Sequence, residues 1–448
     1  MITKVRYVRQ LYQSLWLKGA AESQGSRLLK GASGAFLLRV LYTGTTFITG
    51  ILLARVLGTF GFGTYNYVLT WTITLGLVSN VGFDNLLVRE IATYTAQAKW
   101  ELVRGILRYA NQLVFFLSST IALLAIAVVW KLGIAESPET FAAFCLAMIS
   151  LPIVALRNLT RGAIKGFNHV VLALLPELLI SPIILIVLVV SSHLLLAQYL
   201  NATFTLGLYC ASAVITLVIG IVMLNRVLPP EVRSVEHKYQ LKRWISSALP
   251  FVFLEGLYAL NSQIDVLMLG ALRGVEAAGI YVPVSRGANL ITFAVMAVVG
   301  VLAPVQVNLF VEGQHQELQR LMTKGIRGVL FASLAIALPL IVFGRWYLLL
   351  FGEGFTQGYA ALTILCVGQV VASVSGLAGP LLNMTGFERC TLISAAIGGG
   401  LNIVLNSLLI PSGGIEGAAI ATSVSMMLAN LTNVIWAKQK LGIRFGVW

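Results

Sequence analysis

The 31 lysines and arginines of this 448-residue chain are distributed unevenly between its apolar segments. Twelve apolar runs follow one another, at 33–56, 64–87, 109–130, 140–156, 170–191, 204–224, 246–271, 278–303, 326–344, 359–384, 391–411 and 416–437. Most positive residues lie in segment 1–32, in every second gap and in the tail, while the other gaps and their edges hold only Arg55, Lys131, Arg273 and Arg345. Most runs are near the ~20 residues that cross a bilayer. Because short loops rich in Lys and Arg stay in the cytosol, the sequence predicts a multi-pass protein of the cytoplasmic (inner) membrane with both termini cytoplasmic.

The composition excludes several other classes of protein. Hydrophobic residues make up 58% of the chain and charged residues 11%, which is not typical of a soluble domain. The net charge of +14 does not indicate nucleic acid, because the positive residues lie in predicted loops beside an anionic leaflet. The four cysteines and four histidines are dispersed and no C-x-x-C occurs, so we expect no metal site, no disulfide framework and no cofactor. No phosphate-binding loop or nucleophile motif indicates an enzyme.

A predicted cytosolic gap that contains Pro229 and Pro230 divides the chain into two sets of six runs. The expected domains are a cytosolic amphipathic basic segment, a first six-helix bundle, a cytosolic linker, a second six-helix bundle and a cytosolic tail, at 1–32, 33–225, 226–245, 246–438 and 439–448. The halves share a faint internal match with a constant offset of 216 residues, at Gly58/Gly274, Gly63/Gly279, Tyr65/Tyr281 and Val68/Val284. Repeats of equal orientation are one of the transporter plans. We therefore expect an all-α polytopic protein with about twelve transmembrane helices in two bundles around a central cavity.

Six charged residues lie inside the apolar runs and away from their ends: Arg39, Asp84, Glu177, Glu255, Asp265 and Arg286. A charge at the centre of a bilayer costs at least ~2.5–3.5 kcal/mol, so each of them needs a partner or a wet cavity. Two interpretations remain open. In one, Arg39–Asp84 and Asp265–Arg286 are ion pairs that lock helical hairpins. In the other, Arg39 and Arg286 bind an anionic substrate, and the four carboxylates are counter-ions or sites for a coupling proton or cation.

Four stretches of the sequence resemble the bacterial polysaccharide, or lipid-linked oligosaccharide, flippases of the multidrug/oligosaccharidyl-lipid/polysaccharide exporter superfamily. They are LLARVLGTFGFGTYNYVLTW at 52–71, GFDNLLVREIA at 82–92, QIDVLMLGALRGVEAAGIYVPVSR at 263–286 and NIVLNSLLIPSGGIEGAAIAT at 402–422. The fourth is the most specific, and its matching positions are Asn402, Asn406, Pro411, Gly414, Gly417, Ala418 and Ala419. The resemblance spans both halves.

The resemblance implies a flippase that carries a polyprenyl-diphosphate-linked oligosaccharide across the membrane by alternating access, for surface polysaccharide biosynthesis. Arginine suits such a cargo because its planar fork binds phosphate and stays charged. The expected partners are the bilayer, a coupling proton or sodium ion, a polysaccharide polymerase and a chain-length regulator. A multidrug or cation antiporter of the same superfamily is the alternative, because the buried carboxylates outnumber the arginines. An integral-membrane polymerase or glycosyltransferase is more distant, because the outer gaps are too short to build a site.

Overall fold

The computed structural model describes residues 21–133, 137–196, 200–443 and 445. Within its helices, the side chains of 21–33, 35–36, 196, 253–255, 258–260 and 303–304 are not described. Most of the predicted amphipathic segment 1–32 therefore lies outside the described residues, as does the side chain of Glu255. The backbone is already helical from Ala21, before the first predicted span.

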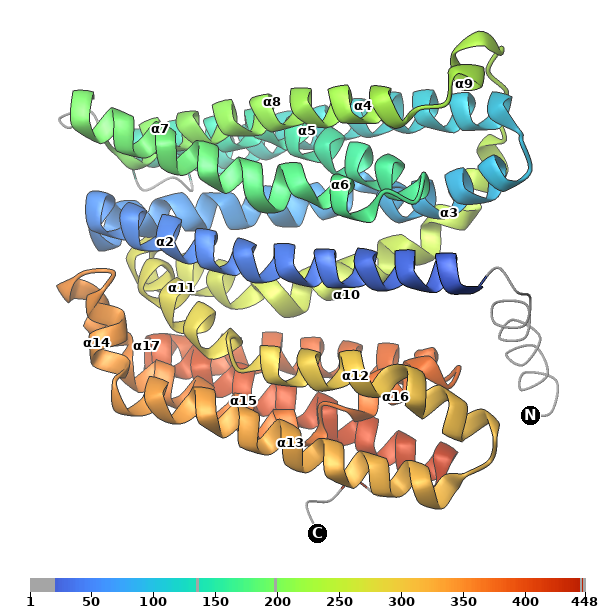
Figure 1. Cartoon of the computed structure of the whole chain (residues 1–448). Coiled ribbons are helices and arrows are strands. Elements are labelled where there is room, and N and C mark those ends of the chain that lie inside the picture. The colour runs from blue at the N-terminus through green and yellow to red at the C-terminus, as the bar shows by residue number, and fades with distance from the viewer. Residues whose placement is uncertain (1–20, 134–136, 197–199, 444, 446–448) are drawn as a thin grey trace. The chain divides into compact units, whose positions relative to one another are not determined.

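The described part of the chain is helical and contains no strand (Figure 1). Nine of its helices are long and apolar enough to cross a membrane. Two of these nine, with 44 and 54 residues, bend at a glycine, and each covers two predicted spans. The predicted fold class, an all-α polytopic membrane protein, is confirmed, while the number of twelve spans stays a prediction.

The chain forms two compact units, one of which comprises Arg27–Gln263. Its elements are α2 (Ala21–Asn80), α3 (Phe83–Ala96), α4 (Trp100–Leu132), α5 (Pro138–Gly166), α6 (Val170–Leu175), η1 (Pro176–Ile180), α7 (Ser181–Leu196), α8 (Ala202–Val227), α9 (Pro230–Ser234) and the first part of α10 (Leu241–Arg273). Helix α5 packs against α3, α4 and α8. Gly162 permits this packing, since a Cβ there would lie 2.4 Å from the carbonyl oxygen of Asp84.

The other unit contains Ile264–Trp448. Its helices are the last part of α10, α11 (Val275–Asn289), α12 (Thr292–Val311), α13 (His315–Val342), α14 (Gly344–Leu349), η3 (Glu353–Gly358), α15 (Tyr359–Ser375), α16 (Ala378–Met384) and α17 (Glu388–Leu441). Helix α15 packs against α13 and α17. The boundary between these compact units falls inside α10, while the predicted domains stay a prediction.

Glycines with positive φ make three of the turns between predicted spans. Gly58, inside α2, has φ 68° and ψ −175°, and Gly274, between α10 and α11, has φ 86° and ψ 165°. These two positions are 216 residues apart, so the internal match in the sequence coincides with a similar backbone conformation. Gly414 bends α17 with φ 53°. Only glycine adopts such angles at little cost, so these residues fix where each hairpin turns.

The segment between the two sequence halves is attached to the first unit. The backbone N–H of Lys238 donates to the carbonyl of Glu101 over 3.1 Å, and the two side chains form an ion pair. Arg104 donates to the carbonyl of Arg233 over 3.0 Å. Gly105 lies beneath this segment, where a Cβ would be 1.9 Å from the Lys238 oxygen. Residues 233–238 are therefore seated on α4.

The start of α10 is anchored to α3 in the same unit. Trp244 is fully buried, and its Nε1–H donates to the hydroxyl of Tyr94 over 2.9 Å. Arg243 pairs with the buried carboxylate of Glu90 over 3.4 Å. Burial raises the pKa of Tyr94 above its ordinary value.

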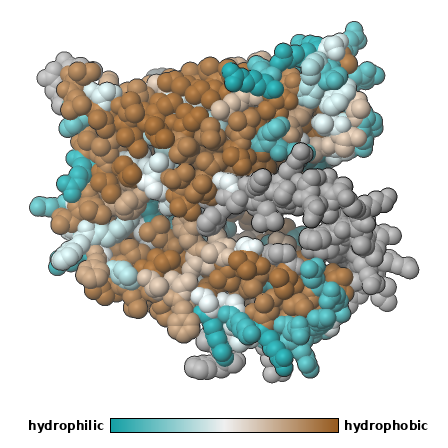
Figure 2. All heavy atoms as spheres, in the orientation of Figure 1, coloured by the Kyte–Doolittle hydropathy of each residue, from teal (hydrophilic) through white to brown (hydrophobic). Residues whose placement is uncertain are grey.

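The surface of the first unit is divided by polarity. Figure 2 shows a nearly continuous apolar surface over α7 and α8, with hydrophilic side chains at the end where α9 lies. The apolar surface includes Val187, Leu194, Leu195 and Val218, which are all exposed. An exposed apolar surface of this extent is typical of contact with a membrane, and α9, in the predicted cytosolic segment 226–245, lies at its hydrophilic end.

Candidate functional sites

The first candidate site is a row of cations on α5. Arg157, Arg161 and Lys165 are four residues apart, which places them on one face of the helix at intervals of ~6 Å. The row occupies the end of α5 that the distribution of Lys and Arg places toward the cytosol. All three residues act electrostatically on Glu177, which follows Pro176 in the π-helical turn η1. Such a turn widens the helix and is frequent at functional sites.

Two carboxylates neutralise part of this cationic row. Arg161 forms an ion pair with Glu177 and lies 3.7 Å from the carboxylate of Asp84. Asp84 lies in the first turn of α3, where the helix dipole favours a negative charge. Its side chain also accepts a hydrogen bond from the backbone N–H of Asn85 over 2.9 Å. Among the described residues, the cation that pairs with Asp84 is therefore Arg161 of α5, and the predicted pairing of Arg39 with Asp84 stays a prediction.

The cationic row keeps an excess of positive charge. Arg39, on an exposed position of α2, is near enough to Lys165 to repel it electrostatically. Two carboxylates therefore oppose four cations. The buried Nε–H of Arg157 has no hydrogen-bond partner within the described residues. A buried donor without a partner costs about 1–3 kcal/mol, and an anion would satisfy it.

The second candidate site surrounds Asp265 in the other unit. Its carboxylate accepts hydrogen bonds from the hydroxyl of Thr422 over 2.7 Å, the amide of Asn406 over 2.8 Å and the hydroxyl of Tyr281 over 3.1 Å. Asn406 also donates to Asn402 over 2.9 Å. These residues come from α10, α11 and both halves of α17, so the bend at Gly414 brings Thr422 back beside Asn402. Neutral donors satisfy both oxygens of Asp265, and the carboxylate needs no pairing with Arg286.

One atom of the Asp265 site has no partner. The buried side-chain oxygen of Asn406 accepts no hydrogen bond within the described residues. The two ends of an amide are assigned from the hydrogen-bond network, and the reversed amide would turn its oxygen toward Asp265. The site would then offer oxygens from a carboxylate, amides and a hydroxyl, the ligand types that hard cations prefer. A protonated carboxyl group, which would donate its O–H to the oxygen of the reversed amide, is the other state that fits this arrangement.

The remaining predicted residues are placed only in part. Arg286 is half-buried in the last turn of α11, where it acts electrostatically on Tyr347. The side chain of Glu255 lies outside those described. Their predicted roles, like those of the other buried charges, stay predictions.

Comparison with protein families settles the class of this chain. The model of a family described as "Polysaccharide biosynthesis protein" matches residues 28–310, which is more than half of the chain. The chain belongs to this family. Membership in this family agrees with the predicted resemblance, and it places the chain among membrane proteins of polysaccharide biosynthesis.

The chain is also similar to individual archaeal membrane proteins. An uncharacterized membrane protein, MJ1068 of Methanocaldococcus jannaschii, is 24% identical over 94% of this chain and 85% of its own length. The probable low-salt glycan biosynthesis flippase Agl15 of Haloferax volcanii is 25% identical over 41% of this chain and 39% of its own length. The similarity to a named flippase thus covers less than half of either protein.

Solved structures support the fold. An inward-facing multidrug resistance MATE family transporter has a TM-score of 0.73 at 14% identity, covering 90% of this chain and 94% of its own. The lipid II flippase MurJ, in an inward closed conformation, has a TM-score of 0.68 at 15% identity, covering 92% of this chain and 87% of its own. At these identities the similarity shows the fold alone, a fold that transporters and flippases share.

Proposed function

We propose that this protein is a flippase that carries a polyprenyl-diphosphate-linked oligosaccharide from the inner to the outer leaflet of the cytoplasmic membrane. The observation that carries the proposal is the cationic row on α5 with its excess of positive charge. A diphosphate carries about two negative charges, and moving such a group unaided into hydrocarbon would cost on the order of tens of kcal/mol. A protein that binds the diphosphate with fixed cations lowers this barrier without any chemistry on the glycan.

The residues of the row divide this task. Arg161, held by Glu177 and Asp84, is positioned before the cargo arrives, and its guanidinium can bind phosphate through two parallel hydrogen bonds. Arg157 supplies the unpartnered donor. Arg39 and Arg286 remain the cations predicted to bind cargo from other helices. The glycan is then displaced across the membrane by alternating access.

Asp265 is the proposed coupling residue. Its negative charge, the neighbouring amides and the unpartnered oxygen of Asn406 favour a monovalent cation, either a proton or sodium, whose binding favours one conformation of the transporter. The same site would also suit a multidrug antiporter, so it supports coupled transport more than a particular cargo.

The test is the leaflet in which the glycan-lipid resides. In a deletion strain we expect glycan-lipid to accumulate where an externally added lectin does not reach it, and the surface polymer to be missing. Arg157→Gln and Lys165→Gln should each restore less lectin-accessible glycan-lipid than the wild type. The matched control, Arg226→Gln, changes an exposed arginine outside the row and should restore it fully. Lectin-accessible glycan-lipid in the deletion strain, together with new sensitivity to cationic drugs, would replace this proposal with the antiporter.

A further inference from the structure

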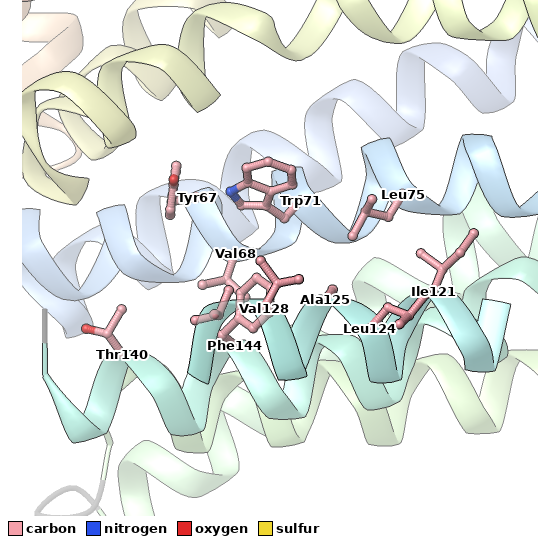
Figure 3. A pocket seen from close by; sticks show the side chains of 11 residues that line it. Tyr67, Val68, Trp71, Leu75, Ile121, Leu124, Ala125, Val128, Thr140 and Phe144 are labelled. Carbon is pink, nitrogen blue, oxygen red and sulfur yellow. The ribbon is translucent and has the colours of Figure 1, made fainter. Parts of the chain in front are cut away.

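The first unit contains an apolar cavity that none of the predicted site residues lines. Its volume is about 380 Å³, and it lies between the second half of α2 and the pair α4 and α5 (Figure 3). Its walls include Tyr67, Trp71, Leu124, Ala125, Val128 and Phe144. The polar part of the lining is small, so the cavity suits a hydrocarbon ligand.

The cavity lies in the predicted outer half of the membrane. Thr140, at its rim, is in the first turn of α5 beside the N-cap Ser137, at the opposite end of α5 from the cationic row. Along α2 the lining extends from Tyr67 to Leu75, a distance of ~12 Å at 1.5 Å per residue. Leu124 and Val128 are 59% and 50% exposed, so the cavity opens sideways toward lipid.

Hydrophobicity alone cannot select a ligand for this cavity. Lipid tails are as apolar as its walls, so a chain that enters from the bilayer gains no hydrophobic free energy. The gain comes from close contact between atoms, which depends on shape. The walls combine the flat rings of Tyr67, Trp71 and Phe144 with branched aliphatic side chains (Figure 3). These surfaces match a chain that alternates flat double bonds with methyl branches better than a straight saturated chain.

We infer that this cavity binds the polyprenyl chain of the cargo in the outer half of the membrane. The inference rests on the proposed function. Thr140 and Arg161 are 21 residues apart on α5, or ~30 Å. The polyprenyl chain and the diphosphate of the cargo therefore contact the same unit, Arg27–Gln263, at two well-separated depths in the membrane. The cavity retains the polyprenyl chain after the headgroup has crossed.

The experiment is photo-crosslinking of the full-length protein in lipid nanodiscs. The probe is a polyprenyl phosphate that carries a diazirine on its chain, and the comparison probe is phosphatidylglycerol with a diazirine on a saturated acyl chain. We expect the polyprenyl probe to label peptides of α2, α4 and α5 that line the cavity, and unlabelled polyprenyl phosphate to compete. Ala125→Phe fills the cavity and should reduce this labelling about tenfold. The matched control Ala127→Phe adds the same ring at an exposed position of α4 and should leave it unchanged.

Three results would overturn the inference: equal labelling of the cavity by the phospholipid probe, labelling that Ala125→Phe does not reduce, or no labelling of the lining peptides. The readout is binding, so it is independent of transfer between leaflets. Transport with an unlabelled cavity would reject the chain site and leave the flippase standing. If the cavity is labelled but the deletion strain still presents its glycan-lipid in the outer leaflet, the proposed function is rejected. The protein would then be a polyprenyl-binding protein of another kind.

Discussion

Gly105→Ala tests how the segment between the halves is attached to the first unit. The new Cβ would lie 1.9 Å from the carbonyl oxygen of Lys238. Carbon and oxygen approach one another to 3.3–3.6 Å at closest, so the segment must move by ~1.5 Å. This displacement breaks the hydrogen bond from Lys238 to Glu101 and weakens the contact of Arg104 with Arg233. Overpacking of this kind costs about 1–3 kcal/mol, and 2 kcal/mol corresponds to a roughly 30-fold rise in the detached population.

Hydrogen exchange measured by mass spectrometry would detect this change. Peptides that cover 233–240 should exchange about 30-fold faster in Gly105→Ala, if their exchange follows detachment of the segment from α4. Peptides of α17, in the other unit, should be unaffected. Gly44→Ala is the control, since a Cβ at this exposed helical position meets nothing within 4 Å. Unchanged protection in Gly105→Ala would show that this contact does not hold the segment, and the reasoning would be refuted.

Three further predictions concern charge and orientation. Arg161→Gln should lower the free energy of unfolding by about 2 kcal/mol, because the pair with Glu177 is only partly buried, and should therefore lower the abundance of the protein in immunoblots. Adding Glu177→Gln should restore this abundance but not the lectin-accessible glycan-lipid. Restored transport in the double variant would contradict a cargo role for Arg161. Asp265→Asn replaces the carboxylate and removes charge-assisted hydrogen bonds that stabilise the site by about 1.5–3 kcal/mol each. In vesicles, transport by this variant should no longer depend on a proton or sodium gradient. A retained dependence would show that another residue couples transport to the ion. In a background without native cysteines, Gln357→Cys should react with an impermeant thiol reagent added outside, whereas His237→Cys should not; the opposite result would reverse the predicted topology.

The fold class could be predicted because it rests on patterns that lie close together in the sequence. Apolar runs and the side bias of Lys and Arg follow directly from the cost of placing charge in hydrocarbon. The glycines at 58 and 274 marked turns because few residues other than glycine take positive φ easily. The division inside α10 was not predictable in this way, since it depends on Trp244 and Arg243 packing against α3, about 150 residues earlier in the chain.

The cationic row was missed for a physical reason. Its three cations lower the hydropathy of the cytosolic half of α5, so the apolar run 140–156 ended before them and they were counted as loop residues. The helix continues to Gly166. The spacing of Arg157, Arg161 and Lys165 was the signal that could have revealed them. The partners of Asp265 were partly visible, because Asn402 and Asn406 were already singled out by the resemblance, whereas Thr422 required knowledge of how α17 bends.

The glycine bends in α2 and α17 also affect how the protein enters the membrane during synthesis. Each bend joins two spans with almost no polypeptide between them, and Arg273 supports the turn of α17 by donating to the carbonyl of Ile410. Two spans connected so tightly must pass from the insertion machinery into the bilayer as a pair, because the turn is too short for one span to enter the bilayer before the other. An alanine at Gly58 or Gly414 would therefore act during biogenesis, and its damage would be complete before any cargo is bound.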